Sequence, residues 1–190
     1  MSPQQLLWQR WGDPAHPAEW DGREGNGGKC SQRFWEYLWV LNHIGEPSSI
    51  LDVGGGQNTF FKDLLKDDVF FVVVDPLAPT SASGDSHGMT VEQYAATKRL
   101  SFKCVTCISV LEHVTDKDAF CAALDSFPCP IVMTLELGEG CVTMPQLYQC
   151  LRQFMNHHVT VMEACPVVAD NSYGGRWRPL GLVLEPNTTL

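Results

Sequence analysis

The chain has 190 residues, with 13 Lys or Arg against 22 Asp or Glu, and a formal net charge of −9 at pH 7. This length predicts one domain, or one domain with an N-terminal extension. The acidic balance argues against non-specific binding to nucleic acid or to an anionic membrane, because both need a basic surface. No apolar run reaches the roughly 20 residues of a membrane-spanning helix, and residues 1–14 lack a signal-peptide pattern. We therefore expect a cytoplasmic protein with no nucleic-acid or membrane partner.

The eight cysteines show no metal-binding framework. Cys104 and Cys107 have the Cys-x-x-Cys spacing, but no second such pair completes a zinc site. Both lie in an apolar run typical of a strand, where residues three apart point to opposite faces. Free cysteine behaves as a small hydrophobic residue. The sequence therefore predicts buried free thiols and no bound metal.

Residues 1–45 are predicted to form an aromatic-rich helical extension that caps the main domain, which comprises residues 46–190. The first forty residues hold five of the six tryptophans, namely Trp8, Trp11, Trp20, Trp35 and Trp39. Residues 27–35 lead into a helix that is predicted to reach Ile44. Two interpretations stay open: the helix packs its aromatic side chains on the sheet, or it closes over a bound ligand.

The first strand, turn and helix of the domain are predicted within residues 49–66. Ile50, Leu51 and Val53 indicate a buried strand, and residues 59–66 have apolar side chains at helical spacing. Between them, three consecutive glycines at positions 54–56 can adopt backbone angles closed to other residues and let a ligand approach the main chain.

Two acidic residues indicate the kind of nucleoside cofactor. Residues 69–74 form a second apolar run, typical of a strand buried on both faces, and Asp75 follows it. An acid about 20 residues after the glycine turn is where a dinucleotide fold binds ribose hydroxyls. A pyrophosphate, however, needs a neutral first turn at the helix N-terminus. Asp52, directly before the glycines, would repel a pyrophosphate and suits a cofactor with a cationic amino-acid end.

At these residues the chain resembles the class I S-adenosylmethionine-dependent methyltransferases. Their glycine loop has the form acid-x-Gly-x-Gly-x-Gly, which Asp52, Gly54 and Gly56 match, whereas Asn58 replaces the third glycine. The resemblance implies S-adenosyl-L-methionine as cofactor. It implies that the cofactor contacts lie at strand ends, at Asp52, Gly54, Gly55, Gly56, Asn58, Asp75, Pro76, Leu77, Asp85, Ser109 and Val110.

The remaining pattern predicts an α/β, Rossmann-like fold with a mostly parallel twisted sheet, helices on both faces and an antiparallel last strand. Strands are expected at 100–109, 130–137, 158–168 and 180–184, and helices at 90–98, 116–127 and 144–155. The chain between Asp75 and Lys103 is short for this family, which predicts a vestigial or missing edge strand. Within it, Asp85 resembles the family's adenine-contacting acid, although an ordinary loop or cap acid is the alternative.

Residues 109–114, Ser-Val-Leu-Glu-His-Val, resemble the fourth motif of the family's small-molecule branch, which includes quinone and related O-methyltransferases. The resemblance implies that Ser109 meets the methionine end of the cofactor and that Glu112 and His113 border the methyl-transfer pocket. His113 is the candidate general base, because imidazole titrates near neutral pH. A capping or packing role for His113 is the alternative.

A Glu-His pair at this place is also similar to the small-RNA 2′-O-methyltransferases, which use a Glu-x-x-Glu-His metal cluster. The first glutamate of that cluster is Ser109 here, so the metal set is incomplete. His157 and His158 could add ligands, but their neighbours predict the start of a strand. We therefore expect no metal.

The expected function is S-adenosylmethionine-dependent methylation of a small molecule or a saccharide at oxygen. The candidate acceptor contacts are Arg33, Trp35, Glu112, Tyr173 and Arg176. The alternatives are a catalytically inactive binding subunit with this fold, an RNA or protein methyltransferase, and a dehydrogenase. A homodimer stays open, because no sequence feature decides the oligomeric state.

Overall fold

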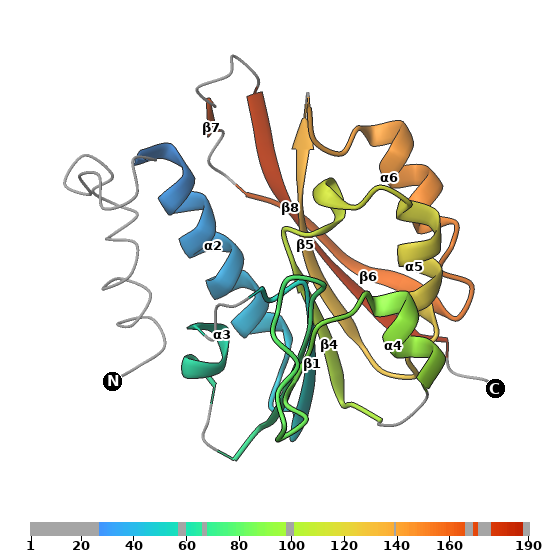
Figure 1. The fold of residues 1–190 in the computed structure, drawn as a ribbon. Coiled ribbons are helices and arrows are strands. Elements are labelled where there is room, and N and C mark those ends of the chain that lie inside the picture. Colours follow the sequence, from blue (N-terminus) through green and yellow to red (C-terminus); the bar gives the residue numbers. More distant parts are fainter. Residues whose placement is uncertain are drawn as a thin grey trace.

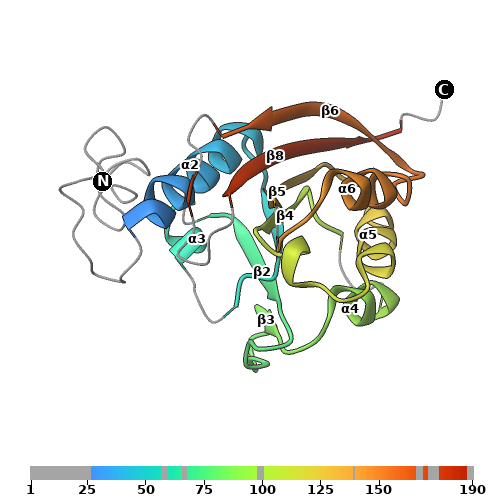
Figure 2. The ribbon, with the colours of Figure 1, turned by 90° about the horizontal axis from the view of Figure 1, so that it is seen from above.

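The computed structural model describes residues 27–56, 60–65, 68–97, 101–138, 140–165, 169–170 and 176–187. A twisted sheet separates two helical layers (Figure 1): α2 and α3 cover one face, and α4, α5 and α6 cover the other. Figure 2 shows the same two layers from above. The arrangement is the one predicted from the alternation of strands and helices.

The sheet follows the order β3-β2-β1-β4-β5-β8-β6, with β7 paired to β8. Strands β1 to β5 run parallel, whereas β8 is antiparallel to β5, β6 and β7. This confirms the predicted mostly parallel sheet with an antiparallel last strand. The strands are β1 (Ser49–Val53), β2 (Phe70–Val74), β3 (Ser86–His87), β4 (Cys104–Ile108), β5 (Ile131–Gly138), β6 (His157–Ala164), β7 (Ala169–Asp170) and β8 (Arg176–Pro186).

The helices begin at residues whose side chains satisfy the first backbone N–H groups. Asp116 caps α5 by accepting a hydrogen bond from the Ala119 N–H at 3.0 Å. Thr143 and Gln146 form a capping box at the start of α6. The helical elements are α2 (Gly27–His43), α3 (Phe60–Asp63), α4 (Val91–Thr97), the 3₁₀ turn η1 (Leu111–His113), α5 (Lys117–Asp125) and α6 (Met144–Leu151).

The sheet edge beyond β2 is trimmed, as the short spacing predicted. β3 has only two residues, which pair parallel with β2. Residues 75–85 form turns and bends between β2 and β3. A short loop therefore connects β2 to β3, and α4 alone leads from β3 to β4.

Strand alternation divides the buried side chains into two cores, one on each face of the sheet. Leu51 and Val53 of β1 face α4, α5 and α6, whereas Ile50 faces α2 and α3. Cys104 and Cys107 likewise lie in opposite cores as buried free thiols, which confirms the prediction for this pair. Burial raises the pKa of Cys104 to about 12, so this thiol stays protonated and packs as an apolar group.

Helix α2 packs its aromatic side chains on the sheet. Phe34 and Trp39 are buried, and the Trp39 ring lies where a side chain at Gly181 of β8 would otherwise project. The Trp39 Nε1–H donates to Glu163 Oε2 of β6 at 2.9 Å. Trp35 stacks on Trp39 with 5.9 Å between ring centroids. The packing interpretation therefore holds for this part of the extension, while residues 1–26 lie outside the described residues.

A buried carboxylate joins the end of α5 to the start of β6. Asp125 accepts hydrogen bonds from the backbone N–H groups of Met155 and Asn156 and lies 2.8 Å from His157 Nδ1. His157 Nε2 lies 3.0 Å from the Cys129 carbonyl oxygen, which can only accept. His157 therefore donates at Nε2, and its ring is fixed on both sides. The strand start predicted at His157 and His158 is confirmed, and the His157 imidazole is committed to this structural contact.

Replacing Asp125 by alanine would leave several buried donors without an acceptor. We expect Asp125→Ala to lower the free energy of unfolding by about 3 kcal/mol or more, because a buried group loses its charged partner. Chemical denaturation followed by circular dichroism measures this change. The matched control is Asp68→Ala at an exposed turn, which should change the same quantity by less than about 0.5 kcal/mol. Equal effects of the two variants would contradict the role given to Asp125.

Candidate functional site

A cavity of about 580 Å³ lies at the carboxyl ends of β1, β2 and β4. We call it the edge cavity. In open α/β sheets, ligands bind at this edge where the strand order reverses, which here is between β1 and β4. Its lining residues follow strand ends or begin helices: Val53, Gly54, Val74, Asp75, Pro76, Leu77, Thr90, Val91, Glu92, Ser109, Val110, His113, Val114, Thr115, Asp116 and Phe120.

The glycine turn after β1 needs glycine for two separate reasons. Gly54 and Gly56 have φ angles of 77° and 62°, in the left-handed region. A Cβ on Gly54 would also overlap the Val110 side chain, which lines the cavity from the turn after β4. The Gly54 N–H donates to the Val74 carbonyl at 2.8 Å. The turn is therefore held against the end of β2, with its backbone facing the cavity.

Asp75 holds the turns after β1 and β2 together. Its Oδ2 accepts from the Gly56 N–H at 2.9 Å, and its Oδ1 accepts from the Leu77 N–H at 2.6 Å. Asp75 is buried, whereas Leu77 is 79% exposed and lines the cavity. A carboxylate oxygen can accept more than one hydrogen bond, so Asp75 can also bind ligand hydroxyls. Leu77 offers an apolar surface on which a planar ring could lie.

Asp52 lies beneath the glycine turn. It is 4% exposed, and its Oδ1 accepts a hydrogen bond from Thr106 Oγ1 of β4 at 2.7 Å. Burial, with a further contribution from the charge on Asp75, raises the pKa of Asp52 to about 7, although the Thr106 hydrogen bond opposes this shift. Asp52 is not among the residues that line the edge cavity. It can act on a bound ligand through its charge and through the shape of the turn above it.

Glu36 of α2 reaches the same edge from the helical layer, and the sequence prediction missed it. Its side chain is fully buried, and its Oε1 accepts hydrogen bonds from Ser109 Oγ and, at 2.9 Å, from Thr134 Oγ1. Ser109 has a φ of 51°, the one positive φ outside glycine in the described ranges. Its N–H donates to the Thr134 carbonyl at 3.0 Å. Glu36 therefore links α2 to the residue that carries the chain from β4 into the cavity wall.

One feature of the sequence could have indicated Glu36. Trp39 and Val40, which are three and four positions further along the helix, are buried. Positions three and four apart lie on the same helix face. An acid on that inward face needs a hydrogen-bonding partner in the sheet, and the hydroxyl groups of Ser109, directly after β4, and Thr134, within β5, supply one.

The segment after β4 brings the predicted base candidate to the cavity. Val110 and His113 line it, and the His113 side chain is exposed. The His113 N–H donates to the Val110 carbonyl at 2.9 Å within the η1 turn. Glu112 is half-buried on the same turn and is not among the lining residues. Of the predicted pair, His113 is therefore the one placed to meet a ligand.

Asp85 lies in the loop before β3. Its Oδ1 accepts hydrogen bonds from the Ser81 hydroxyl at 2.5 Å and the Ser83 hydroxyl at 2.7 Å, and these bonds lower the pKa of Asp85. It is not among the residues that line the edge cavity, so the alternative of a loop acid has direct support. The adenine contact stays a prediction. The first turn of α4, from Thr90 to Glu92, lines the cavity instead.

Several predicted contacts cannot be placed. Asn58 and Tyr173 lie outside the described residues, as do the side chains of Arg33 and Arg176. Trp35 is half-buried beside Trp39 and is not a lining residue of the edge cavity. Within the described ranges, no group of three or more His, Cys, Asp or Glu side chains could hold a metal ion. No helix in those ranges is long and apolar enough to cross a membrane.

No protein-family model matches the sequence, and no curated protein does. The fold, however, is similar to solved structures. A Galdieria sulphuraria protein, provisionally assigned as a sarcosine dimethylglycine methyltransferase, matches with a TM-score of 0.61 and 10% identity over 96% of this chain and 97% of its own. Magnesium protoporphyrin IX methyltransferase from Synechocystis PCC 6803, solved with bound SAM, matches with a TM-score of 0.58 and 13% identity over 96% and 97%.

A third structure shows that this fold is not limited to methyl transfer. The [4+2]-cyclase SpnF matches with a TM-score of 0.58 and 10% identity, over 97% of this chain and 96% of its own. At such identities the likeness establishes the fold alone. The chain therefore has the Rossmann-like fold of the class I S-adenosylmethionine-dependent methyltransferases. Its reaction has to be argued from the edge cavity.

The raised pKa of Asp52 predicts a pH-dependent stability. Between about pH 4 and pH 7 the folded protein holds a proton on Asp52 that the unfolded chain has released, so the free energy of unfolding falls as pH rises, by up to about 1.4 kcal/mol per pH unit from this group. Asp52→Asn removes this contribution and can keep the Thr106 hydrogen bond. Denaturation at about pH 5 and pH 8 should show the variant gaining stability over the wild-type protein at the higher pH. If the free energies of unfolding of the variant and of the wild-type protein changed equally with pH, the raised pKa of Asp52 would be contradicted.

The contacts of Glu36 predict that its hydrogen bonds shape the edge cavity. A glutamine oxygen can accept from both hydroxyls, so Glu36→Gln should bind S-adenosylhomocysteine within about threefold of the wild-type protein, whereas Glu36→Ala should bind at least about tenfold more weakly. Isothermal titration measures both. The control is Val40→Ala, which loosens the same buried helix face without a contact to Ser109. If Val40→Ala weakens binding as much as Glu36→Ala, the effect is one of helix packing only.

Proposed function

We propose that this protein is an S-adenosylmethionine-dependent methyltransferase that methylates a small molecule at an oxygen atom. The observation that carries the proposal is the pair of turns joined by Asp75, which places the Gly54 backbone, the Asp75 carboxylate and the exposed Leu77 around one cavity at the strand-order reversal. Methyltransferases among the solved structures with this fold support it, including one solved with bound SAM.

The chemistry of the edge cavity fits this cofactor better than a pyrophosphate cofactor. Asp75 could accept hydrogen bonds from ribose hydroxyls, as acids at this place do, and Leu77 could cover one face of the adenine. The carboxyl groups of Asp52 and Asp75 lie at or beneath the cavity, and that of Glu36 is bonded to Ser109 in its wall. Ionised carboxylates here, with Asp52 among them only above its pKa of about 7, favour a ligand with a cationic end and disfavour a phosphate.

When bound, S-adenosylmethionine supplies a methyl group on a positively charged sulfur, which an acceptor oxygen takes by in-line displacement. The task of the protein is then to hold the acceptor on the axis of the displacement and to accept its hydroxyl proton. His113 is the side chain that we assign to this proton, because it lines the cavity from the turn after β4 and imidazole accepts protons near neutral pH. Ser109 and Val110 form the adjoining wall.

The finer parts of the proposal rest on the sequence. Arg33, Trp35, Glu112, Tyr173 and Arg176 are the candidate acceptor contacts, and residues 1–45 are the candidate cap over the site. We also propose a cytoplasmic location, with a homodimer left open. The trimmed edge at β3 and Asn58 in the glycine loop favour a second candidate, a binding subunit with this fold that has lost catalysis.

Titration calorimetry with S-adenosylmethionine, S-adenosylhomocysteine and NAD tests the cofactor. We expect micromolar binding of the first two ligands and none of NAD. Asp75→Ala should abolish binding, because it removes the ribose acceptor and releases both turns. Asp68→Ala, an exposed acid next to β2, is the matched control and should keep full affinity. Binding of NAD alone, or unchanged affinity in Asp75→Ala, would contradict the proposal.

The base role of His113 is tested by turnover. We expect His113→Ala to keep its affinity for S-adenosylhomocysteine and to lower kcat by about 100-fold on a hydroxyl acceptor, as loss of a general base does. The activity should be partly restored as pH rises and the acceptor ionises on its own. An unchanged kcat would return His113 to a structural role, and binding without turnover across an acceptor panel would favour the inactive subunit.

A further inference from the structure

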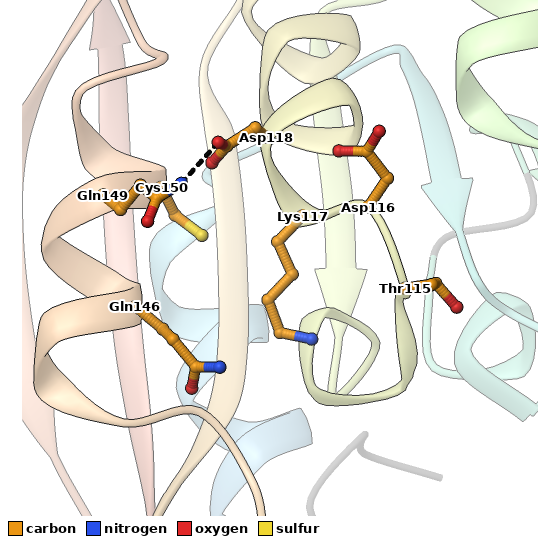
Figure 3. A pocket seen from close by; sticks show the side chains of 7 residues that line it. All are labelled: Thr115, Asp116, Lys117, Asp118, Gln146, Gln149 and Cys150. Atoms are coloured by element: carbon orange, nitrogen blue, oxygen red, sulfur yellow. Dashed lines mark hydrogen bonds between the residues drawn. The ribbon is translucent and has the colours of Figure 1, made fainter.

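A second cavity, of about 450 Å³, lies between the first turn of α5 and one side of α6. We call it the helix cavity, and Figure 3 shows its lining side chains. Every one of them is polar or carries a thiol: Thr115, Asp116, Lys117, Asp118, Gln146, Gln149 and Cys150. The cavity is therefore built to contact a polar ligand.

The helix cavity adjoins the edge cavity. Thr115 and Asp116, in the connection from η1 to α5, line both. Lys117 lines the helix cavity and donates from Nζ to the carbonyl of Val114 at 2.6 Å, and Val114 lines the edge cavity. His113 lies one residue further back along the same connection. A ligand in the helix cavity is thus separated from the base candidate only by this short segment.

The polar groups of the helix cavity are held in place. The Gln146 Oε1 accepts from the Thr143 N–H at 2.9 Å in the capping box, which leaves its Nε2 to donate elsewhere. Figure 3 shows the Gln146 amide pointing toward the Lys117 side chain, whose ammonium turns the other way, toward the connection that holds Val114. Asp118 of α5 accepts from Gln149 Nε2 of α6 at 2.5 Å, which ties the two walls together.

The composition of the lining decides the class of ligand. Two carboxylates, Asp116 and Asp118, against one ammonium oppose an anion such as a phosphate. The Lys117 ammonium offsets one of these two carboxylates, and the lining has no aromatic or large aliphatic side chain for an apolar ring. Fixed donors next to fixed acceptors suit a neutral ligand whose groups both donate and accept. A hydroxyl does this, with one donor and two acceptor lone pairs.

We propose that the helix cavity binds the hydroxyl-rich body of the methyl acceptor, a saccharide, with its reacting hydroxyl directed past Thr115 toward His113 and the edge cavity. This inference rests on the proposed function and names its substrate class. Lys117, Gln146 and Gln149 then act as specificity residues, which bind the parts of the acceptor that do not react.

Saturation-transfer NMR on the full chain with saturating S-adenosylhomocysteine tests the proposal. The probes are glucose, galactose, mannose and rhamnose, compared with catechol and p-cresol. Lys117→Met and Gln149→Leu each remove a polar group from the lining at similar volume. Arg152→Met removes an exposed cation just beyond α6 that is not a lining residue, and it serves as the control.

We expect at least one monosaccharide to bind and the phenols not to bind. Lys117→Met and Gln149→Leu should weaken the monosaccharide by about three- to tenfold, the effect of one lost hydrogen bond. Arg152→Met should leave it unchanged, and all three variants should keep their affinity for S-adenosylhomocysteine. Bound S-adenosylhomocysteine with no monosaccharide bound, or monosaccharide binding that both variants leave intact, overturns the inference alone. Failure of the wild-type protein to bind S-adenosylhomocysteine overturns the proposed function, and this inference with it.

Discussion

The Asp75 carboxylate joins two turns that the sheet alone would leave independent. Parallel pairing aligns β1 with β2 up to Val53 and Val74 and then ends. Beyond that point, hydrogen bonds from the Gly56 and Leu77 N–H groups to the two oxygens of Asp75 fix the turn after each strand. The edge cavity has its shape because these turns cannot move apart. An acid at this position therefore serves the fold and, in our proposal, the ligand as well.

The negative charge at this edge has a cost within the fold. Burial, with a smaller contribution from the charge on Asp75, raises the pKa of Asp52 to about 7, and Glu36 is fully buried behind Ser109. Buried carboxyl groups are retained where a partner compensates them. A cofactor with a cationic sulfur and a cationic amino group would be such a partner. On this account, a bound cationic ligand would favour the ionised form of Asp52 and would lower its pKa.

Helix α2 belongs to the site as well as to the core. Its aromatic residues pack against β8, where Gly181 leaves room for the Trp39 ring. This packing brings Glu36 to Ser109, directly after β4, and to Thr134 within β5. Ser109 is hydrogen-bonded to Glu36 and also lines the edge cavity. A shift of α2 would therefore move part of the cavity wall. The part of the chain before the first strand can therefore influence ligand binding even where it makes no ligand contact.

The sequence predicted those elements whose signal lies within a short run of residues. Apolar runs located β1, β2, β4 and β5, and the short spacing after Asp75 predicted the vestigial β3. The sequence did not predict features that depend on contacts between distant segments of the chain. β8 begins at Arg176 and not at Leu180, because its backbone pairs with β5 through residues 177–179 although Arg178 and Pro179 interrupt the apolar run. Glu36 was missed because its partners lie 73 and 98 positions away. The adenine contact of Asp85 stays a prediction; in the fold its carboxylate accepts hydrogen bonds from Ser81 and Ser83.

The most direct test of the central claim is a map of where the cofactor product binds. In a titration of the ¹⁵N-labelled protein with S-adenosylhomocysteine, we expect the largest amide shifts at four residues. Gly54, Leu77 and Ser109 line the edge cavity, and the Gly56 N–H donates to Asp75 in its wall. The amide signals of β6, which lies at the opposite edge of the sheet from β3, should stay unchanged. Shifts that gather away from these four residues, or no shifts at a saturating concentration, would contradict the account.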